Sequence, residues 1–362
     1  MTAAERKSAS LTARLRARIA TEGPISVFDY MEACNSDPAG GYYTTREPIG
    51  AQGDFITAPE ISQIFGELVG LWCVAVWQSM GEPRAVTVAE LGPGRATLLR
   101  DAIRAWRSVP EFLQHASLAL IETSPTLRAQ QTAALADCPM PLRWIASLDE
   151  VAAGPLIVIA NEFLDALPVR QFIRRDGAWR ERHVECAADG TFVFVEGEPA
   201  DLEDVAVEAS EGDVLELRPA DADLIAALAA HAKQSPLAAL VIDYGHGETA
   251  CGDTLQAVRA HRYADPLVSP GKSDLTAHVD FSGIKELARK NGLRAFGPLP
   301  QGEFLLKLGL AERRDALLRS ATPQQRDEIV SGASRLVDPR EMGLLFKVLA
   351  LTSAALPTPP PF

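Results

Sequence analysis

The sequence contains few cysteines, and none of them is paired at a metal-binding or redox spacing. The five cysteines are scattered along the chain: Cys34, Cys73, Cys138, Cys186 and Cys251. An odd number without a Cys-x-x-Cys pair fits neither a disulfide framework nor a zinc cage. This usage is typical of a reducing compartment, and we expect a cytoplasmic protein.

Long hydrophobic runs and an excess of positive charge are also missing. The longest near-apolar run, Leu68–Trp77, is about half of the ~20 residues that a membrane helix needs, so it predicts a buried helix and no membrane span.

The 35 basic residues are outnumbered by 48 acidic ones, for a net charge of −13. A chain this acidic repels phosphate backbones, which argues against nucleic acid and favours a small ligand or a basic protein as partner.

The composition that remains is that of an ordinary globular protein, with 47% hydrophobic and 23% charged residues. It supplies ample apolar material for a core. Near the N-terminus, basic residues accompany Leu11, Leu15 and Ile19 at helical spacing, which predicts an amphipathic first helix. The alternative is a transit peptide, which would send the protein to the mitochondrial matrix.

Short aliphatic runs that end in a polar residue predict buried parallel strands. Four runs have this form: Val86–Leu91, Leu118–Glu122, Leu156–Asn161 and Leu237–Tyr244. Helical patterns alternate with them, and the clearest cover Thr97–Trp106, Pro125–Ala136 and Ala222–Lys233. This alternation predicts a doubly wound, Rossmann-like α/β sheet.

Two regions interrupt the alternation. Runs of alternating apolar and polar residues within 169–196 surround Asp176-Gly177 and Asp189-Gly190, which predicts a small antiparallel β insertion. The region 245–280, rich in Gly, Pro, Asp and His, predicts a lid or binding loop. We therefore expect a helical extension with a covering loop over 1–82, a sheet domain formed by 83–168 and 220–355, an insertion over 169–219 and a loose tail over 356–362.

The sharpest local feature is a hydrophobic strand that runs into a glycine turn and then a helix. Gly92, Pro93 and Gly94 form the turn after the strand Val86–Leu91. Glycines let backbone N–H groups approach a polar ligand closely at the positive end of a helix. A dinucleotide fingerprint would have glycine or alanine where Thr97 stands, and no Gly-Lys-Ser/Thr follows for a phosphate loop, so both readings lose support.

Carboxylates lie before this turn and at the end of the next strand. Glu90 comes two residues before the first glycine, and Glu122 closes the run Leu118–Glu122. A carboxylate at the end of the second strand is placed to accept both ribose hydroxyls of an adenosine, and one near the first strand end can bind an ammonium group. Together they predict an adenosine ligand that carries an amino acid. The alternative for Glu122 is a solvated strand end.

A third set of polar residues follows the strand Leu156–Asn161. Asn161, Glu162 and Asp165 lie at or just after its carboxyl end, which is where ligands bind to open α/β sheets. These side chains are therefore candidates to face the reacting atom. Asn161 or Asp165 could instead cap the next helix.

The glycine turn and several other segments resemble those of a known family. The glycine turn is similar to the first motif of class I S-adenosylmethionine-dependent methyltransferases, and the wider pattern resembles the MidA family, which includes a mitochondrial complex I assembly methyltransferase. The other segments that carry the resemblance are Gly41–Tyr43, Gly53–Ser62, Asn161–Pro168, Ile242–Gly245, Asp274–Phe281 and Gln301–Phe304. One departure is Ala96, which stands where the family's turn usually has a third glycine.

The resemblance implies S-adenosyl-L-methionine as cofactor and, by analogy with the mitochondrial member, symmetric dimethylation of an arginine in a respiratory complex I subunit or its bacterial counterpart. Arginine stays protonated to a pKa beyond about 12, so its guanidinium needs carboxylates to orient it and to take a proton. Glu162 and Asp165 are the expected catalytic residues. The expected cofactor-binding residues are Glu90, Gly92, Pro93, Gly94, Glu122, Asn161, Asp54, Phe55 and Thr57.

Asp54, Phe55 and Thr57 belong to a segment that precedes the sheet and must fold back to reach a ligand. Asp54 offers a carboxylate, and Phe55 offers an aromatic face for a sulfonium or guanidinium cation. The structural alternative is a turn followed by a helix, with Thr57 as its N-cap and Glu60 as the capping-box partner.

Two other classes of function stay open on the sequence. Asp243, His246, Asp274 and His278 allow a metal-dependent hydrolase, although no His-x-x-x-His spacing supports it and we expect no metal. A non-catalytic assembly chaperone is the other alternative. The β insertion and the acidic run 196–216 are candidate docking surfaces for a basic protein partner.

Overall fold

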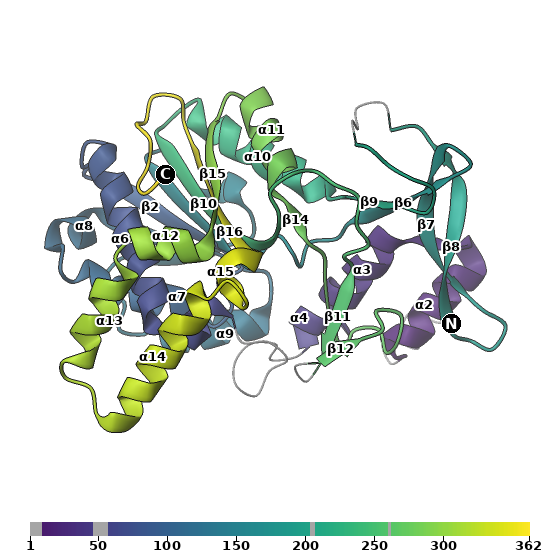
Figure 1. The fold of residues 1–362 in the computed structure, drawn as a ribbon, viewed down its shortest axis with the longest axis horizontal. Coiled ribbons are helices and arrows are strands. Elements are labelled where there is room, and N and C mark those ends of the chain that lie inside the picture. The colour runs from purple at the N-terminus through teal and green to yellow at the C-terminus, as the bar shows by residue number, and fades with distance from the viewer. Residues whose placement is uncertain (1–8, 46–56, 203–206, 260–261) are drawn as a thin grey trace. The chain divides into compact units, whose positions relative to one another are not determined.

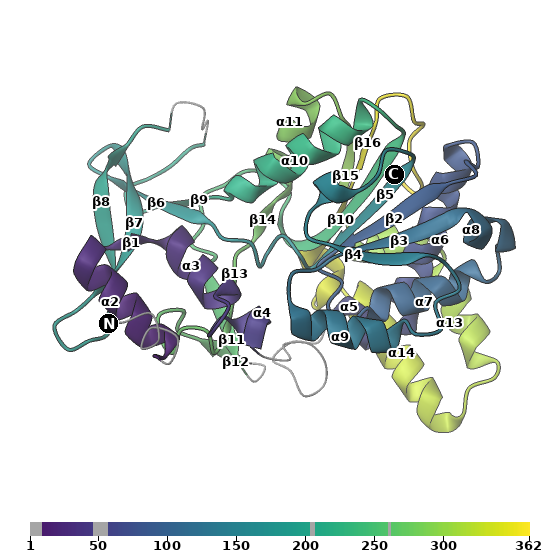
Figure 2. The same ribbon diagram turned by 180° about the vertical axis from the view of Figure 1, so that it is seen from behind.

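The computed structural model describes residues 9–45, 57–202, 207–259 and 262–362 (Figures 1 and 2). The chain divides into two compact units. The first consists of Met1–Phe55, Asp165–Ala222 and Glu248–His278, and the second of Ile56–Leu164, Asp223–Gly247 and Val279–Phe362. No helix in the described ranges is long and apolar enough to cross a membrane.

The second unit is built on a sheet of eight strands among the described residues, in the order β15-β16-β10-β5-β2-β3-β4, with β14 paired to β10. The chain leaves β2 towards β3 and β4 and then returns to β5 on the other side, so a topological switch point lies between β2 and β5. The predicted α/β fold is confirmed. The strands are β2 (Val86–Leu91), β3 (Ala116–Ile121), β4 (Leu142–Ile145), β5 (Leu156–Asn161), β10 (Leu237–His246), β14 (Val279–Asp280), β15 (Arg294–Pro300) and β16 (Phe346–Thr352).

The central strands β2, β3, β5 and β10 run parallel, whereas β16 pairs antiparallel with β10 and β15. Every residue of β5 is buried, as expected for a strand covered by helices on both faces. The helices of this unit are α5 (Ala58–Ile61), α6 (Gln63–Ser79), α7 (Thr97–Trp106), α8 (Pro110–His115), α9 (Pro125–Ala134), α11 (Phe281–Lys290), α12 (Gln301–Lys307), α13 (Leu310–Leu318), α14 (Pro323–Val337) and α15 (Met342–Leu345). Helix α10 (Pro219–Ala232) contains the boundary between the units.

Helix α6 contains the predicted buried run Leu68–Trp77 and packs closely on α7. A Cβ at Gly70 would lie 2.7 Å from the Cα of Ala102, and Trp106 donates its indole N–H to the Gly70 carbonyl at 2.8 Å. Glycine therefore lets the two helix backbones approach at this point.

The first unit joins three stretches of chain that are far apart in the sequence. Helices α2 (Leu11–Glu22), α3 (Val27–Ser36) and α4 (Tyr42–Thr45) come from the N-terminal part. A five-stranded sheet follows among the described residues, with β1 (Ile25–Ser26), β6 (Arg170–Arg175), β7 (Ala178–Cys186), β8 (Phe192–Ala200) and β9 (Val214–Leu217). A further sheet contains β11 (Gln256–Arg259), β12 (Arg262–Ala264) and β13 (Asp274–Thr276).

The predicted antiparallel insertion is present as the β6–β7–β8 meander. The region 245–280 differs from the irregular loop expected, because its described residues include β11 to β13, of which β13 packs against α3. Leu11, Leu15 and Ile19 form the buried face of α2, so the predicted amphipathic helix is confirmed. All three belong to the same core as Val184 of β7.

The C-terminal segment, expected to be loose, packs on the second unit. Leu356 is buried and its carbonyl accepts a hydrogen bond from Arg294 Nη1 at 2.6 Å. The ring of Phe362 lies 5.8 Å from that of Phe304. The four prolines predict an unstructured segment, whereas Leu356 and Phe362, at its two ends, attach it to the core.

Candidate functional site

The carboxyl ends of β2, β3 and β5 bring together most of the described candidate residues. Gly92 continues β2 and donates its backbone N–H to the carbonyl of Ile121, the last residue of β3, at 3.0 Å. It has φ +57°, and a Cβ there would lie 2.7 Å from Cδ2 of Phe163. Glycine is therefore required both by the backbone conformation and by the ring that follows β5.

The turn ends in a second left-handed stretch. Gly94 has φ +51°, and Ala96 has φ +60° immediately before α7. Ala96 is fully buried, and as an L-residue in this conformation it costs about 1–2 kcal/mol. The alanine thus adopts the conformation for which a third glycine would be suited.

Glu90 supplies a buried carboxylate beside this turn. It is 4% exposed, and its Oε2 has no hydrogen-bond partner within the described part of the chain. Burial raises the pKa of Glu90 to about 8. A buried acceptor without a donor is costly unless a ligand supplies one, so Glu90 fits an ammonium group.

Glu122 follows β3 and is 8% exposed. Its Oε1 accepts the Ser124 backbone N–H at 2.8 Å, and its Oε2 accepts Nε2 of Gln131 at 3.1 Å. Burial raises the pKa of Glu122, while these two donors oppose the rise. An ionised carboxylate has about four acceptor positions, so Glu122 retains capacity for ribose hydroxyls.

Gln131 was not among the residues predicted from the sequence. It lies on α9 and is completely buried. The signal was a polar residue at helical spacing between Leu127 and Leu135, both of which are buried. Its side chain contacts both the turn and Glu122, since Nε2 also donates to the Gly94 carbonyl at 2.9 Å.

Asn161 and Glu162 lie at the end of β5. Asn161 is 8% exposed, and its Oδ1 lacks a hydrogen-bond partner among the residues described. Glu162 has φ +48°, and its backbone N–H donates to the Ile242 carbonyl of β10 at 2.8 Å. A left-handed glutamate at a strand end is a strained position of the kind found at functional sites.

The Glu162 carboxylate also holds α5. Its Oε1 accepts the backbone N–H of Ala58 at 2.8 Å and Nδ2 of Asn161 at 3.3 Å. Thr57 is the N-cap residue of α5 but makes no side-chain capping bond in the described structure. Glu60 accepts instead from Thr97 Oγ1 at 2.5 Å. Thr57 therefore has the predicted N-cap position, but the predicted capping box with Glu60 is wrong, because Glu162 accepts the Ala58 N–H and the Glu60 carboxylate is bound to Thr97.

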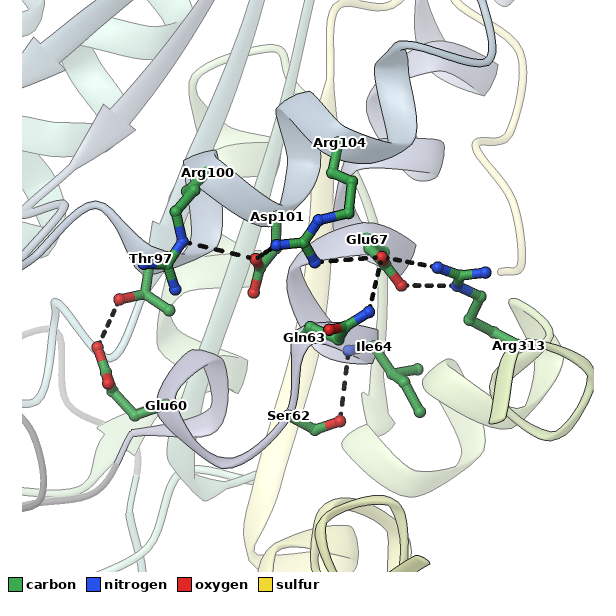
Figure 3. A network of polar contacts seen from close by, with 10 residues as sticks. All are labelled: Glu60, Ser62, Gln63, Ile64, Glu67, Thr97, Arg100, Asp101, Arg104 and Arg313. Atoms are coloured by element: carbon green, nitrogen blue, oxygen red, sulfur yellow. Dashed lines mark hydrogen bonds and ion pairs between the residues drawn. The ribbon is translucent and has the colours of Figure 1, made fainter. Parts of the chain in front are cut away.

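Figure 3 shows a network of polar contacts close to α5, in which buried carboxylates pair with arginines. Glu67 of α6, 2% exposed, accepts both Nε and Nη2 of Arg313 from α13, at 2.7 and 2.8 Å. Arg104 of α7 contacts the same Glu67 carboxylate at 3.4 Å and the Asp101 carboxylate at 2.9 Å. These contacts link α6, α7 and α13, and Figure 3 shows them beside the Glu60–Thr97 bond.

The remaining candidates are placed as follows. Asp165 belongs to the first unit and is 6% exposed. Its main-chain carbonyl accepts a hydrogen bond from the Ala277 backbone N–H at 3.0 Å. In the same unit, the Tyr43 hydroxyl contacts both carboxylate oxygens of Asp274 at 2.8 Å. Burial, together with the charges of Asp274 and Asp165, raises the pKa of Tyr43. Asp54 and Phe55 lie outside the described residues.

The metal interpretation is not supported by the geometry. Asp243 accepts the backbone N–H groups of Tyr244 at 2.9 Å and Leu164 at 3.0 Å, and Asp280 caps α11 through Gly283 N. In the described ranges, no group of three or more His, Cys, Asp or Glu side chains could hold a metal ion. These acids therefore anchor the backbone at the ends of β10 and β14.

The acceptor groups around the glycine turn fit an adenosine ligand with an amino-acid part. Among the described residues, nothing donates to one carboxylate oxygen of Glu90 or to the amide oxygen of Asn161, and the Glu122 carboxylate is oriented by two donors. Gly92 keeps the backbone accessible where a side chain would meet Phe163. The arrangement can bind a cation at one strand end and a pair of hydroxyls at the neighbouring one.

Comparison with known proteins gives a consistent result. Residues 68–299 match the profile of a family described as "Putative S-adenosyl-L-methionine-dependent methyltransferase". The mitochondrial protein arginine methyltransferase NDUFAF7 homolog of Drosophila melanogaster is 36% identical, covering 98% of this chain and 87% of that protein. Protein arginine methyltransferase NDUFAF7 of Homo sapiens, also mitochondrial, is 34% identical, covering 96% and 84%.

Solved structures agree with the sequence matches. A likely methyl transferase from Burkholderia thailandensis, solved with bound S-adenosyl-homocysteine, superimposes with a TM-score of 0.83 at 30% identity. The match covers 96% of this chain and 92% of that one. A native crystal structure of an uncharacterized protein from the same organism gives a TM-score of 0.81 at 30% identity. The similarity therefore extends over both units.

Proposed function

The chain belongs to this MidA-like family of S-adenosyl-L-methionine-dependent methyltransferases, and we propose that its methyl acceptor is an arginine side chain of a protein. The predicted family, cofactor and enzyme class are confirmed. The observation that carries the proposal is the similarity to arginine methyltransferases along nearly the whole chain. The metal-dependent hydrolase and the non-catalytic chaperone are not favoured.

In the proposed cofactor site, Glu90 binds the ammonium group of the cofactor and Glu122 binds its ribose hydroxyls. The backbone at Gly92, Pro93 and Gly94 runs along the amino-acid part, and Asn161 offers its amide oxygen, to which no described residue donates. The cofactor, when bound, supplies an electrophilic methyl group on a sulfonium. Asp54, Phe55 and Thr57 stay predicted contacts of the covering segment.

Glu162 is the proposed carboxylate that orients the acceptor guanidinium and takes its proton. The bonds from Ala58 N and Asn161 Nδ2 fix its side chain in one orientation, which is what positioning a planar cation requires. Asp165, three residues further along the chain, stays the predicted second carboxylate. An arginine cannot lose its proton unaided at neutral pH, so a carboxylate at the acceptor contributes to the rate.

Symmetric dimethylation, and a respiratory complex I subunit or its bacterial counterpart as substrate, stay predictions from the family resemblance. The relatives bear mitochondrial names, so a mitochondrial matrix location joins the cytoplasm as a proposal for this chain. The β insertion is the proposed docking surface for the protein substrate.

The decisive experiment is methyl labelling in a lysate that lacks this protein. Purified protein and radiolabelled S-adenosyl-L-methionine are added, and labelled products are identified by mass spectrometry. We expect label on an arginine of a protein, and none with a Gly92→Val variant, which cannot accommodate the turn. Label on a small molecule or on another residue type would overturn the arginine proposal. Cofactor binding without any labelled product would support the chaperone instead.

A further inference from the structure

Gln131 joins two parts of the cofactor site that are separate in the sequence. Its Nε2 donates to the Gly94 carbonyl at 2.9 Å and to Glu122 Oε2 at 3.1 Å. We infer that Gln131 is a positioning residue that holds the Glu122 carboxylate in the orientation that receives the ribose hydroxyls and couples it to the glycine turn. The inference rests on the cofactor site proposed above.

The direction of the Gln131 amide is fixed by a third contact. Trp144 of β4 donates its indole N–H to Gln131 Oε1 at 2.8 Å. An indole N–H can only donate, so the atom that faces it must be the amide oxygen, and the amide nitrogen must face Gly94 and Glu122. Both N–H groups of the amide thus have acceptors.

An apolar side chain at this position would be enough to fill the core. Gln131 lies between Leu127 and Leu135 on the buried face of α9, and it is completely buried. Burying an amide costs free energy unless every polar atom is paired. Here all of the pairing is directed to the glycine turn, to Glu122 and to the tryptophan that orients the amide.

The charge of Glu122 gives this contact a measurable consequence. Burial raises the pKa of Glu122, and the hydrogen bonds from Ser124 and Gln131 counteract it. Without the Gln131 donor, the ionised carboxylate is less stable and the pKa rises further. The acceptor form that binds ribose is then lost at a higher pH than in the wild type.

The test measures S-adenosyl-homocysteine affinity by titration calorimetry for Gln131→Met, which preserves length and removes all three hydrogen bonds. We expect at least about tenfold weaker binding, because the carboxylate loses a charge-assisted donor. The weakening should increase as the pH falls. Gln130→Met, on the neighbouring residue of the same helix, is the matched control and should bind like the wild type.

A double-mutant cycle separates positioning from packing. In a Glu122→Ala background, Gln131→Met should weaken binding severalfold less than in the wild type, because the carboxylate that Gln131 positions is already gone. An equal loss in both backgrounds, or wild-type affinity and pH profile in Gln131→Met, would overturn the inference. Trp144→Phe offers a second route if Gln131→Met does not fold, and should weaken binding severalfold only when Glu122 is present.

The Glu122→Ala variant distinguishes a wrong ribose assignment from a wrong role for Gln131. If Glu122→Ala binds S-adenosyl-homocysteine as tightly as the wild type, the ribose assignment is wrong and the inference falls with it. If Glu122→Ala weakens binding while Gln131→Met does not, the cofactor site stands and only the role of Gln131 is refuted.

Discussion

The Glu90 carboxyl is buried beside the glycine turn, and burial raises its pKa to about 8, so cofactor binding by Glu90 as proposed should depend on pH. At neutral pH the free protein holds a proton on Glu90 that must leave when an ammonium group binds. Affinity for S-adenosyl-homocysteine should therefore rise by up to tenfold per pH unit between about pH 6 and pH 8. Calorimetry in buffers of different ionisation enthalpy should detect the released proton, and a Glu90→Gln variant should release none.

The same shift affects the stability of the free protein. Glu90 has an ordinary pKa of 4.5 when unfolded and about 8 when folded, so the folded chain binds more protons between these values. The contribution of Glu90 to the free energy of unfolding therefore decreases as the pH rises through this window. Chemical denaturation at several pH values should show a decline that Glu90→Gln lacks. The same decline in both proteins would contradict the burial of an unpaired carboxyl.

Glu162→Gln tests whether this residue acts on the acceptor. Glutamine keeps an oxygen that can accept the Ala58 N–H, so α5 should stay in place and cofactor affinity should change by only a few fold. Loss of the base should lower methyl transfer by about a hundredfold or more. Affinity and single-turnover rate are measured on one preparation. A parallel fall in both would show that Glu162 serves the cofactor, and full activity would remove it from the site.

At the scale of secondary-structure elements, the Glu67–Arg313 pair connects the helical segment between β15 and β16 to α6. Arg313→Met removes two hydrogen bonds to a buried carboxylate, leaving Arg104 and Gln63 as its donors. Since Arg313 is itself about a third exposed, we expect a loss of about 1–3 kcal/mol in the free energy of unfolding. Urea titration measures it.

The neighbouring arginine provides the control for this prediction. Arg314 pairs with the exposed carboxylate of Asp315, and such pairs contribute about 0–1 kcal/mol. Arg314→Met should therefore be close to neutral. Equal effects of the two substitutions would mean that the buried network does not hold α13.

At the scale of the whole molecule, each unit has a hydrophobic core of its own. One core packs α6 and α7 on the central sheet, and another packs α2 and α3 with β7. The cofactor contacts proposed at Glu90, Glu122 and Asn161 all belong to the second unit. Bound ligand should stabilise that unit by about 2.7 kcal/mol at a hundredfold excess over Kd.

Hydrogen exchange followed by mass spectrometry can resolve the two units. Saturating S-adenosyl-homocysteine should slow exchange in β2 and α9 and leave the β7–β8 hairpin unchanged. Glu122→Ala at the same ligand concentration should show much weaker protection. Equal protection of the hairpin and of β2 would indicate that the units unfold together.

The parallel core of the second unit and the methyltransferase family could both be predicted from the sequence. The strands Val86–Leu91 and Leu156–Asn161 match the structure residue for residue, because strands buried on both faces are continuous aliphatic runs. Glu90, Glu122 and Asn161 could be chosen as candidates because the ends of parallel strands meet at one edge of a sheet, and their contacts with the cofactor stay predictions. The family followed from motifs distributed along the whole chain.

Tertiary structure alone decided how distant segments complete these elements. The first unit assembles from three stretches of chain, so its short strands β11 to β13 depend on partners that a local pattern does not reveal. Glu162 replaces Thr57 as the partner of the α5 N-terminus, and Glu60 turns to Thr97. Gln131 acquires its role only because α9 brings it beside Gly94, Glu122 and Trp144, since hydrogen bonds depend on positions in space rather than on spacing in the chain.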